Sequence, residues 1–414
     1  MKILVLVEDL RINKSSAGIR RSNIIKALLD NRHRLKCIYD YSDSNDFPWL
    51  KSVLFSHKKI KVVEDSIWVK ILRKLPKANA LSSYLRGFSL NDYKKINSWK
   101  KTIKDELNKD NTYDFILVLG AGNSNLNFFA ISEIKVSIPY IVNYHDPYPI
   151  HQYPKPYSKV ADFVGKIRVK KSNKVMRKAY KVSFPSLRLY EWMLQFHPVL
   201  ENKSFIAPHI YTKLKNLPNF EDEDNLDFDV SKFNILHIGS LLGPRNPKHL
   251  LKAFSRFVDE DQEKKDNVVL NIIGSVTREN KNFDKEITSK TIRVIKERIS
   301  YKKSIELMHK TNVLLILEAV AEDSPFMPGK LADYIAVKKT ILALTPINSE
   351  TTRLLGKDYL YITEMNNENE IYNILKMLWN DWRNNSLKSN IPKELIEYIS
   401  PERFNEKLIT QLKK

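Results

Sequence analysis

The chain has little cysteine, little glycine and no long apolar run, and each shortage excludes a class of protein. Of 414 residues only Cys37 is a cysteine, which excludes an internal disulfide and a thiolate metal cluster and indicates a reducing compartment. Ten glycines exclude a collagenous class. No segment approaches the ~18 consecutive apolar residues of a membrane span, and the apolar start at 3–7 is too short for a signal peptide. We therefore expect a cytoplasmic protein.

Positive charge is what the sequence has in excess. Its 69 lysines and arginines against 48 acidic residues give a net charge of +21, which favours contact with nucleic acid, anionic lipid or phosphorylated substrates. A simple lysine-rich composition is the alternative. Two stretches, 57–104 and 157–180, combine basic with aromatic or apolar residues at helical spacing. They predict that the protein is peripheral to a membrane and that an anionic membrane surface is its partner. A solvated helix face over an ordinary core is the competing interpretation. No recognised nucleic-acid-binding module is present, so nucleic acid is not favoured as a partner.

The length and the alternation of strand and helix signals predict two α/β domains with parallel sheets. Strands are expected at 3–7, 35–39, 115–119, 140–143, 182–184 and 204–207, and then at 234–238, 268–273, 292–295, 313–317, 340–344 and 359–362. The acidic run 220–229 separates the two series, and 401–412 has the pattern of an amphipathic helix. The predicted division is 1–210, 228–395 and a terminal helix within 396–414.

A loop broken by proline and glycine leads into a short apolar helix within 324–344. Lys330 lies at this junction and Asp333 one turn later. Helix N-termini carry unpaired N–H groups that favour anions, so the lysine and carboxylate could hold a phosphate and a sugar hydroxyl. An ordinary helix start with a solvated lysine is the alternative interpretation.

A second motif lies at 237–254, where a strand ends in a Gly/Pro-rich loop before a helix. Gly239 and Gly243 would let the backbone approach a ligand. Ser240 lies in the same turn, Arg245 offers a fork that fits phosphate oxygens, and Lys248 adds a point charge. The segment predicts a phosphate site, although a glycine loop with one arginine is weak evidence alone.

The segment 324–344 resembles the donor-sugar loop of family-4-type glycosyltransferases, which have the GT-B fold. Many members read Pro-x-Lys-[Leu/Val]-x-Glu-Tyr-[Leu/Ile]-Ala-x-Gly-Lys-Pro-[Ile/Val], matched here by Pro328, Lys330, Leu331, Tyr334, Ile335, Ala336, Lys339 and Ile341. Asp333, Lys338 and Thr340 replace the usual Glu, Gly and Pro. The pair of glutamates seven residues apart is absent, because Pro325 stands at the first position. The segment 237–254 is similar to the family's Gly-rich turn, whose basic pair neutralises the leaving diphosphate.

The resemblance implies a fold of two Rossmann-like domains facing a cleft, with a C-terminal helix crossing back to the first domain. It also implies roles outside the two motifs. The residues concerned are Gly18 and Arg20 at the donor diphosphate, His145 and Asp146 with Asp333 as catalytic groups, and Tyr301 and Ser304 at the nucleotide. Simpler alternatives are a strand-to-helix turn at Gly18, a capping Asp146 beside a half-buried His145, and a capping Ser304.

The resemblance therefore implies a glycosyltransferase that moves a sugar from a nucleoside diphosphate sugar to an acceptor hydroxyl. Positive groups would replace a divalent metal, and no cofactor is expected. The expected acceptor is a lipid-linked glycan or lipopolysaccharide in surface polysaccharide or capsule assembly, with retention of configuration. A nucleotide-sugar 2-epimerase of the same fold and a non-enzymatic polyanion-binding protein are the alternatives. The sequence does not specify the sugar, base, linkage or oligomeric state.

Overall fold

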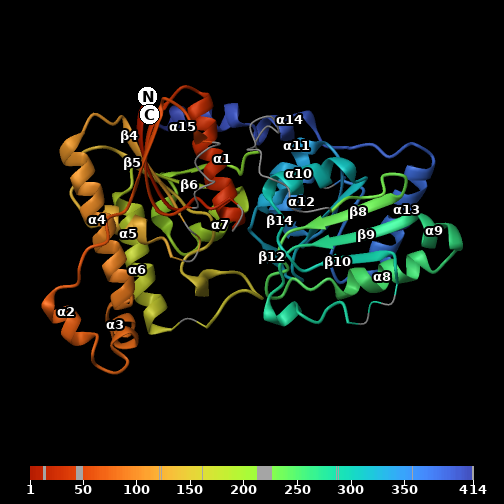
Figure 1. Cartoon of the computed structure of the whole chain (residues 1–414), viewed down its shortest axis with the longest axis horizontal. Coiled ribbons are helices and arrows are strands. Elements are labelled where there is room, and N and C mark those ends of the chain that lie inside the picture. Colours follow the sequence, from red (N-terminus) through yellow and green to blue (C-terminus); the bar gives the residue numbers. More distant parts are fainter. Residues whose placement is uncertain are drawn as a thin grey trace. The chain divides into compact units, whose positions relative to one another are not determined.

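In the computed structural model the chain forms two compact units, each built around a parallel sheet (Figure 1). The first unit comprises Met1–Tyr153, Ser158–Pro208 and Pro401–Lys414, and the second comprises Pro154–Tyr157 and His209–Ser400. The structure describes residues 1–12, 15–42, 50–120, 122, 124–160, 162–211, 226–285, 287, 289–356 and 358–412. Each unit is described by itself.

Seven parallel strands form the sheet of the first unit, in the order β3-β2-β1-β4-β5-β6-β7. The inner strands are almost continuously apolar, as parallel strands covered on both faces require; every residue of β4 is buried. The strands are β1 (Lys2–Asp9), β2 (Arg34–Tyr41), β3 (Phe55–Lys59), β4 (Phe115–Leu119), β5 (Tyr140–Asn143), β6 (Lys181–Phe184) and β7 (Ser204–Ile206).

Several helices of the first unit, though not α3 or α5, begin where a side chain satisfies an open N–H group. The Ser15 hydroxyl accepts from the Gly18 N–H at 2.8 Å, and Ser89 and Asp92 form a reciprocal capping box. The helices are α1 (Ser16–Asp30), α2 (Ile67–Leu72), α3 (Ala78–Arg86), α4 (Leu90–Lys109), α5 (Leu126–Ser132), α6 (Phe163–Lys178), α7 (Leu187–Leu194) and α15 (Pro401–Leu412).

The last helix, α15, belongs to the first unit although the second unit precedes it in the chain. It packs on α1, as Figure 1 shows, and buries Phe404 and Leu408. Asn405 Oδ1 accepts a 2.7 Å hydrogen bond from Nε2 of His33, where both side chains are buried. The helix predicted at 401–412 is therefore confirmed, and so is its return to the first domain.

Six parallel strands form the sheet of the second unit, in the order β10-β9-β8-β11-β13-β15, and β12 pairs with β14 beside it. The strands are β8 (Phe233–Ile238), β9 (Val268–Ile273), β10 (Ile292–Ile295), β11 (Val313–Leu317), β12 (Asp323–Ser324), β13 (Thr340–Leu344), β14 (Asn348–Ser349) and β15 (Ile362–Thr363). The helices are α8 (Lys248–Val258), α9 (Gln262–Asn267), α10 (Tyr301–Lys310), α11 (Gly329–Val337), α12 (Glu350–Leu355), α13 (Glu368–Arg383) and α14 (Lys393–Tyr398).

Two strands differ from the sequence-based expectation. Edge strand β3 was not predicted, and the strand expected at 359–362 is instead β15, of which only Ile362 was included. Tyr359 precedes β15, and its hydroxyl donates to the Ile341 carbonyl at 2.8 Å. Most of the acidic run 220–229 lies outside the described residues, whereas Asp227 accepts from the Lys310 amine at 2.7 Å. The Asp227 carboxylate is thus committed to an exposed ion pair.

Candidate functional site

The clearest polar cluster of the second unit lies where β8 ends and α11 begins. The Lys330 amine lies 3.3 Å from Nε2 of His237, near the end of β8. Gly239 has φ +140°, and a Cβ there would lie 2.6 Å from the Lys330 amine. Pro328 caps α11 without a side-chain hydrogen bond. The glycine turn therefore receives the Lys330 side chain beside open helix N–H groups.

Hydrogen bonding fixes the tautomer of His237. Its Nδ1 lies 3.2 Å from the Leu315 carbonyl, which only accepts, so Nδ1 carries the proton and Nε2 accepts from Lys330. Burial, aided by the charge of Lys330, holds the pKa of His237 well below 6.5. Burial and nearby Arg245 also hold the pKa of Lys330 well below 10.5, with Glu318 partly opposing this. Basic groups thus lie close together in one site, where each disfavours the charged form of another. A bound anion would favour their charged forms.

Arg245 is held in this site by a braced loop. The Asn280 amide donates to the carbonyls of Leu241, Gly243 and Arg245 at 3.3, 2.9 and 3.1 Å. Arg245 Nε is buried and has no hydrogen-bond partner among the described residues. An unsatisfied buried donor of this kind costs about 1–3 kcal/mol, so a bound acceptor would be favourable. Sequence reasoning missed Asn280, since nothing near it in the chain marks it as a loop anchor.

The other two residues predicted in this motif have different surroundings. The Ser240 hydroxyl lies 2.7 Å from that of Ser275, which links the turns after β8 and β9. Lys248 is exposed at the first position of α8. The structure therefore brings Arg245 close enough to lower the pKa of Lys330, and leaves Lys248 on the surface.

Asp333 and Tyr301 form a buried pair between α10 and α11. The Tyr301 hydroxyl donates to Asp333 Oδ1 at 2.9 Å, and both residues are nearly fully buried. Ser304 donates to the Ser300 carbonyl at 2.8 Å within its own helix. This hydrogen bond joins α11 to α10 and orders the Tyr301 side chain. One Asp333 oxygen is thus used for structure.

Glu318, directly after β11, is a further buried group that sequence reasoning missed. It accepts from the hydroxyls of Thr345 and Thr351 at 2.8 and 2.6 Å, and from Ser324. Its charge favours the protonated form of Lys330. The only sequence signal was a carboxylate immediately after an apolar run. Its position at a strand's carboxyl end fits the place where ligands bind in open α/β sheets.

The first unit has its own polar cluster at the carboxyl ends of β1, β4 and β5. Buried Glu8 accepts from the Ser124 hydroxyl and, at 3.1 Å, from the Asn127 N–H, and burial raises the pKa of Glu8. Arg21 donates to the Asp9 carbonyl at 2.6 Å. The cluster is therefore ordered by a mixture of carboxylates and guanidinium groups.

His145 and Asp146 belong to the same cluster. Burial lowers the pKa of His145; Asp146 opposes this shift, while Arg21 and Arg20 add to it. A Cβ on Gly122 would lie 2.8 Å from Asp146 Oδ2. The structure thus brings Arg20, His145 and Asp146 together, at the strand ends expected for a ligand site.

Gly18 has a packing role at the start of α1. A Cβ added there would collide with the Arg11 carbonyl, so glycine permits the close approach of the preceding loop to the helix. This contact accounts for the glycine without a ligand. The predicted contact of Gly18 with a donor diphosphate stays a prediction.

Two features are absent from the described residues. Nowhere among them do three or more His, Cys, Asp or Glu side chains gather closely enough to hold a metal ion. Within the same part of the chain, no helix combines the length and apolarity needed to cross a bilayer.

Comparison with solved structures identifies the fold. No family model and no curated protein matches the chain. Sucrose-phosphate synthase from Thermosynechococcus elongatus aligns with a TM-score of 0.66 at 12% identity, over 100% of this chain and 99% of that one. A glycosyltransferase from Rickettsia africae gives 0.59 at 12%, over 99% and 94%. An E. coli structure of trehalose-6-phosphate bound with UDP-2-fluoro glucose gives 0.61 at 10%, over 100% and 99%. Across its whole length the chain therefore has the GT-B fold predicted from its sequence.

Proposed function

We propose that the chain is a glycosyltransferase that moves a sugar from a nucleoside diphosphate sugar to an acceptor hydroxyl. The observation that carries the proposal is the crowding of Lys330 and Arg245 at the glycine turn after β8, next to an open helix N-terminus. Similar folds include a protein described as a glycosyltransferase and one bound with UDP-2-fluoro glucose. A diphosphate is the anion that such a pair of cations suits.

The residues of the second unit suggest how the donor is held and activated. Arg245 Nε and the Lys330 amine would bind the two phosphates, and their charge would stabilise the leaving nucleoside diphosphate without a metal ion. His237 would orient Lys330 through Nε2. Tyr301, ordered by Asp333, would border the base, with Ser304 one turn later. Lys248 and Ser240 would contribute at the edges of the site.

In the first unit we propose that His145 and Asp146 serve the sugar and the acceptor. His145 is neutral near pH 7 because burial lowers its pKa, and a neutral imidazole can accept a proton from a hydroxyl. Arg20 would add charge beside it, with Gly18 in the same strand-to-helix segment. Retention of configuration, and a lipid-linked glycan or lipopolysaccharide acceptor at the inner membrane face, are the finer parts of the proposal.

Ligand binding and product analysis test the proposal together. UDP or GDP should raise the melting temperature of the purified protein, whereas an oligonucleotide should not. Mass spectrometry should then detect glycosylated acceptor when the protein is given a nucleotide-sugar panel and native acceptor lipid. An epimerised nucleotide sugar without transfer would instead identify the epimerase activity, and stabilisation by oligonucleotide alone would refute the proposal.

Lys330→Ala provides the matched variant. Transfer should slow strongly while the melting temperature stays nearly unchanged, because the lost contact with His237 is offset by removal of a buried amine whose charged form burial and Arg245 disfavour. Lys339→Ala in the same motif serves as the control and should keep its activity. Normal activity per folded Lys330→Ala molecule would return Lys330 to a purely structural role.

A further inference from the structure

Helices α2 and α3 expose an apolar surface that the fold leaves uncovered. Eight of the 23 large apolar side chains exposed in the described part of the chain lie between residues 67 and 85. None of the six residues of α2 is buried, and α3 buries only Ser82. We call this the α2–α3 surface, defined by the exposed side chains of Ile67, Trp68, Ile71, Leu72, Leu81 and Leu85.

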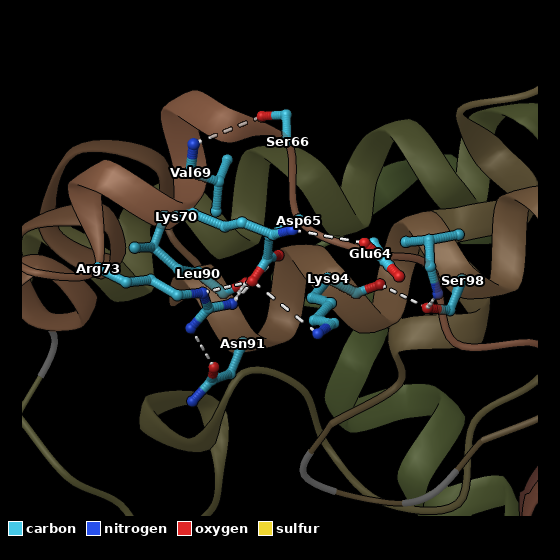
Figure 2. Close-up of polar contacts among 11 residues, drawn as sticks. Glu64, Asp65, Ser66, Val69, Lys70, Arg73, Leu90, Asn91, Lys94 and Ser98 are labelled. Carbon is cyan, nitrogen blue, oxygen red and sulfur yellow. Dashed lines mark hydrogen bonds and ion pairs between the residues drawn. The ribbon is translucent and has the colours of Figure 1, made fainter.

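The exposure is built into the fold, because α2 is anchored from its inner side (Figure 2). Arg73 donates to Asp65 at 2.6 Å and to Asn91 at 2.6 Å, and also reaches the Leu90 carbonyl at 3.3 Å. Lys94 adds an ion pair with Asp65 at 3.9 Å. Figure 2 shows these polar groups gathered between α2 and α4. The inner side of the helix is therefore polar and occupied, which leaves its apolar side chains outside.

The neighbouring charge is positive. Tyr84 on α3 contacts Phe163 at the start of α6 with ring centroids 5.0 Å apart, so the apolar surface continues to that helix. Lys166, Lys170 and Lys174 are exposed at four-residue spacing on α6, whose only acidic neighbour in the segment is its cap, Asp162. On α2 itself, Lys70 is largely exposed and makes only a 3.4 Å pair with exposed Glu64.

We propose that the α2–α3 surface inserts into the interface of a bilayer that contains anionic lipid, with the α6 lysines against the headgroups. Apolar residues flanked by cations at helical spacing are the combination that lies in such an interface. Each cation near an anionic surface adds attraction that salt screens, and the apolar side chains add binding that salt does not screen. Membrane insertion itself does not depend on the proposed function. Only the role of the insertion, which is to bring the first unit to a membrane-held acceptor, rests on the proposed function.

The fluorescence of a dye attached at position 68 tests insertion directly and without substrate. Trp68→Cys can be labelled with an environment-sensitive dye in the full chain, because Cys37 is fully buried and burial raises the pKa of its thiol. The dye should shift to the blue and brighten with phosphatidylcholine–phosphatidylglycerol vesicles. The same dye on Ile347→Cys, a similarly exposed site in the second unit, should not respond. Equal responses at both sites would overturn the proposal.

Vesicle sedimentation measures how much the apolar side chains contribute to membrane affinity. Trp68→Ser with Leu72→Ser should weaken vesicle binding roughly 100-fold, at about tenfold for each apolar side chain withdrawn from the interface. The control pair, Ile347→Ser with Leu360→Ser, should bind like the parent protein. High salt should weaken but not abolish parent binding. Complete release by salt, or a dimer in lipid-free solution that Trp68→Ser dissociates, would overturn the proposal, while stabilisation by UDP would leave the proposed transfer reaction intact.

Discussion

Binding of a nucleoside diphosphate should draw a proton onto Lys330. In the free protein, burial and Arg245 hold the pKa of Lys330 well below its usual value, and the amine hydrogen-bonds neutral His237. A diphosphate oxygen about 4 Å from the amine would attract its charged form by ~4 kcal/mol at an effective dielectric constant near 20. That energy changes a protonation equilibrium roughly a thousandfold. Above the free-state pKa, binding therefore takes up a proton, and affinity rises as the pH falls.

Isothermal titration of UDP in buffers with different ionisation enthalpies measures this uptake. At a mildly alkaline pH the observed binding enthalpy should vary linearly with the ionisation enthalpy of the buffer. The slope gives the number of protons taken up, which should reach about one per site. Lys330→Met, which keeps the apolar stem, should abolish the buffer dependence, whereas Lys248→Met on the exposed start of α8 should preserve it. A heat that is the same in every buffer for the parent protein would refute the reasoning.

Three other predictions concern the second unit, and a fourth concerns the α6 lysines of the first. Arg245→Ala should weaken nucleoside diphosphate binding by roughly 1.5–3 kcal/mol by calorimetry, because a charged hydrogen bond is lost; unchanged affinity would count against its role. Gly239→Ala and Gly356→Ala should each lower the unfolding free energy measured in urea by about 1–3 kcal/mol, since both glycines have positive φ. Only Gly239→Ala should impair UDP binding, because its Cβ displaces the Lys330 amine. Since folding lowers the pKa of His237, the unfolded chain binds more protons, so unfolding free energy should fall as the pH drops below 6.5, less so in His237→Asn. Replacing Lys166, Lys170, Lys171 and Lys174 by Gln should weaken binding to anionic vesicles without lowering the melting temperature, and equal binding would assign their charge to composition.

Much of the fold could be predicted because buried parallel strands leave a strong local signal. The runs that became β1, β4, β11 and β13 are almost wholly apolar, and each lies within the predicted range or extends it by a few residues. By contrast, β3 reads Phe-Ser-His-Lys-Lys, an exposed edge strand with no apolar alternation. Its strand conformation comes from pairing with β2, which no local pattern records.

The candidate site shows the same limit. Lys330 and Arg245 could be chosen because helix starts and glycine turns mark them in the chain, and the family resemblance sharpened that choice. Asn280 and Glu318 could not, because their importance depends on carbonyls and hydroxyls up to 39 residues away in sequence. Likewise, Trp68 and Trp99 look alike in a basic, aromatic stretch, yet one is 77% exposed and the other fully buried. Only tertiary packing decides which of these tryptophans is exposed on the α2–α3 surface and which is buried in the core.

The return of α15 to the first unit has a consequence for how the protein is made. During synthesis, residues 209–400 emerge before α15, so the second unit has nearly all of its chain while the first still lacks a helix. Until then the face of α1 that contacts α15 is uncovered, and His33 has no Asn405 to bond. The half of the protein that is translated first is thus the half completed last. A chain cut at Ser400 should leave the second unit foldable and the first exposed to proteolysis.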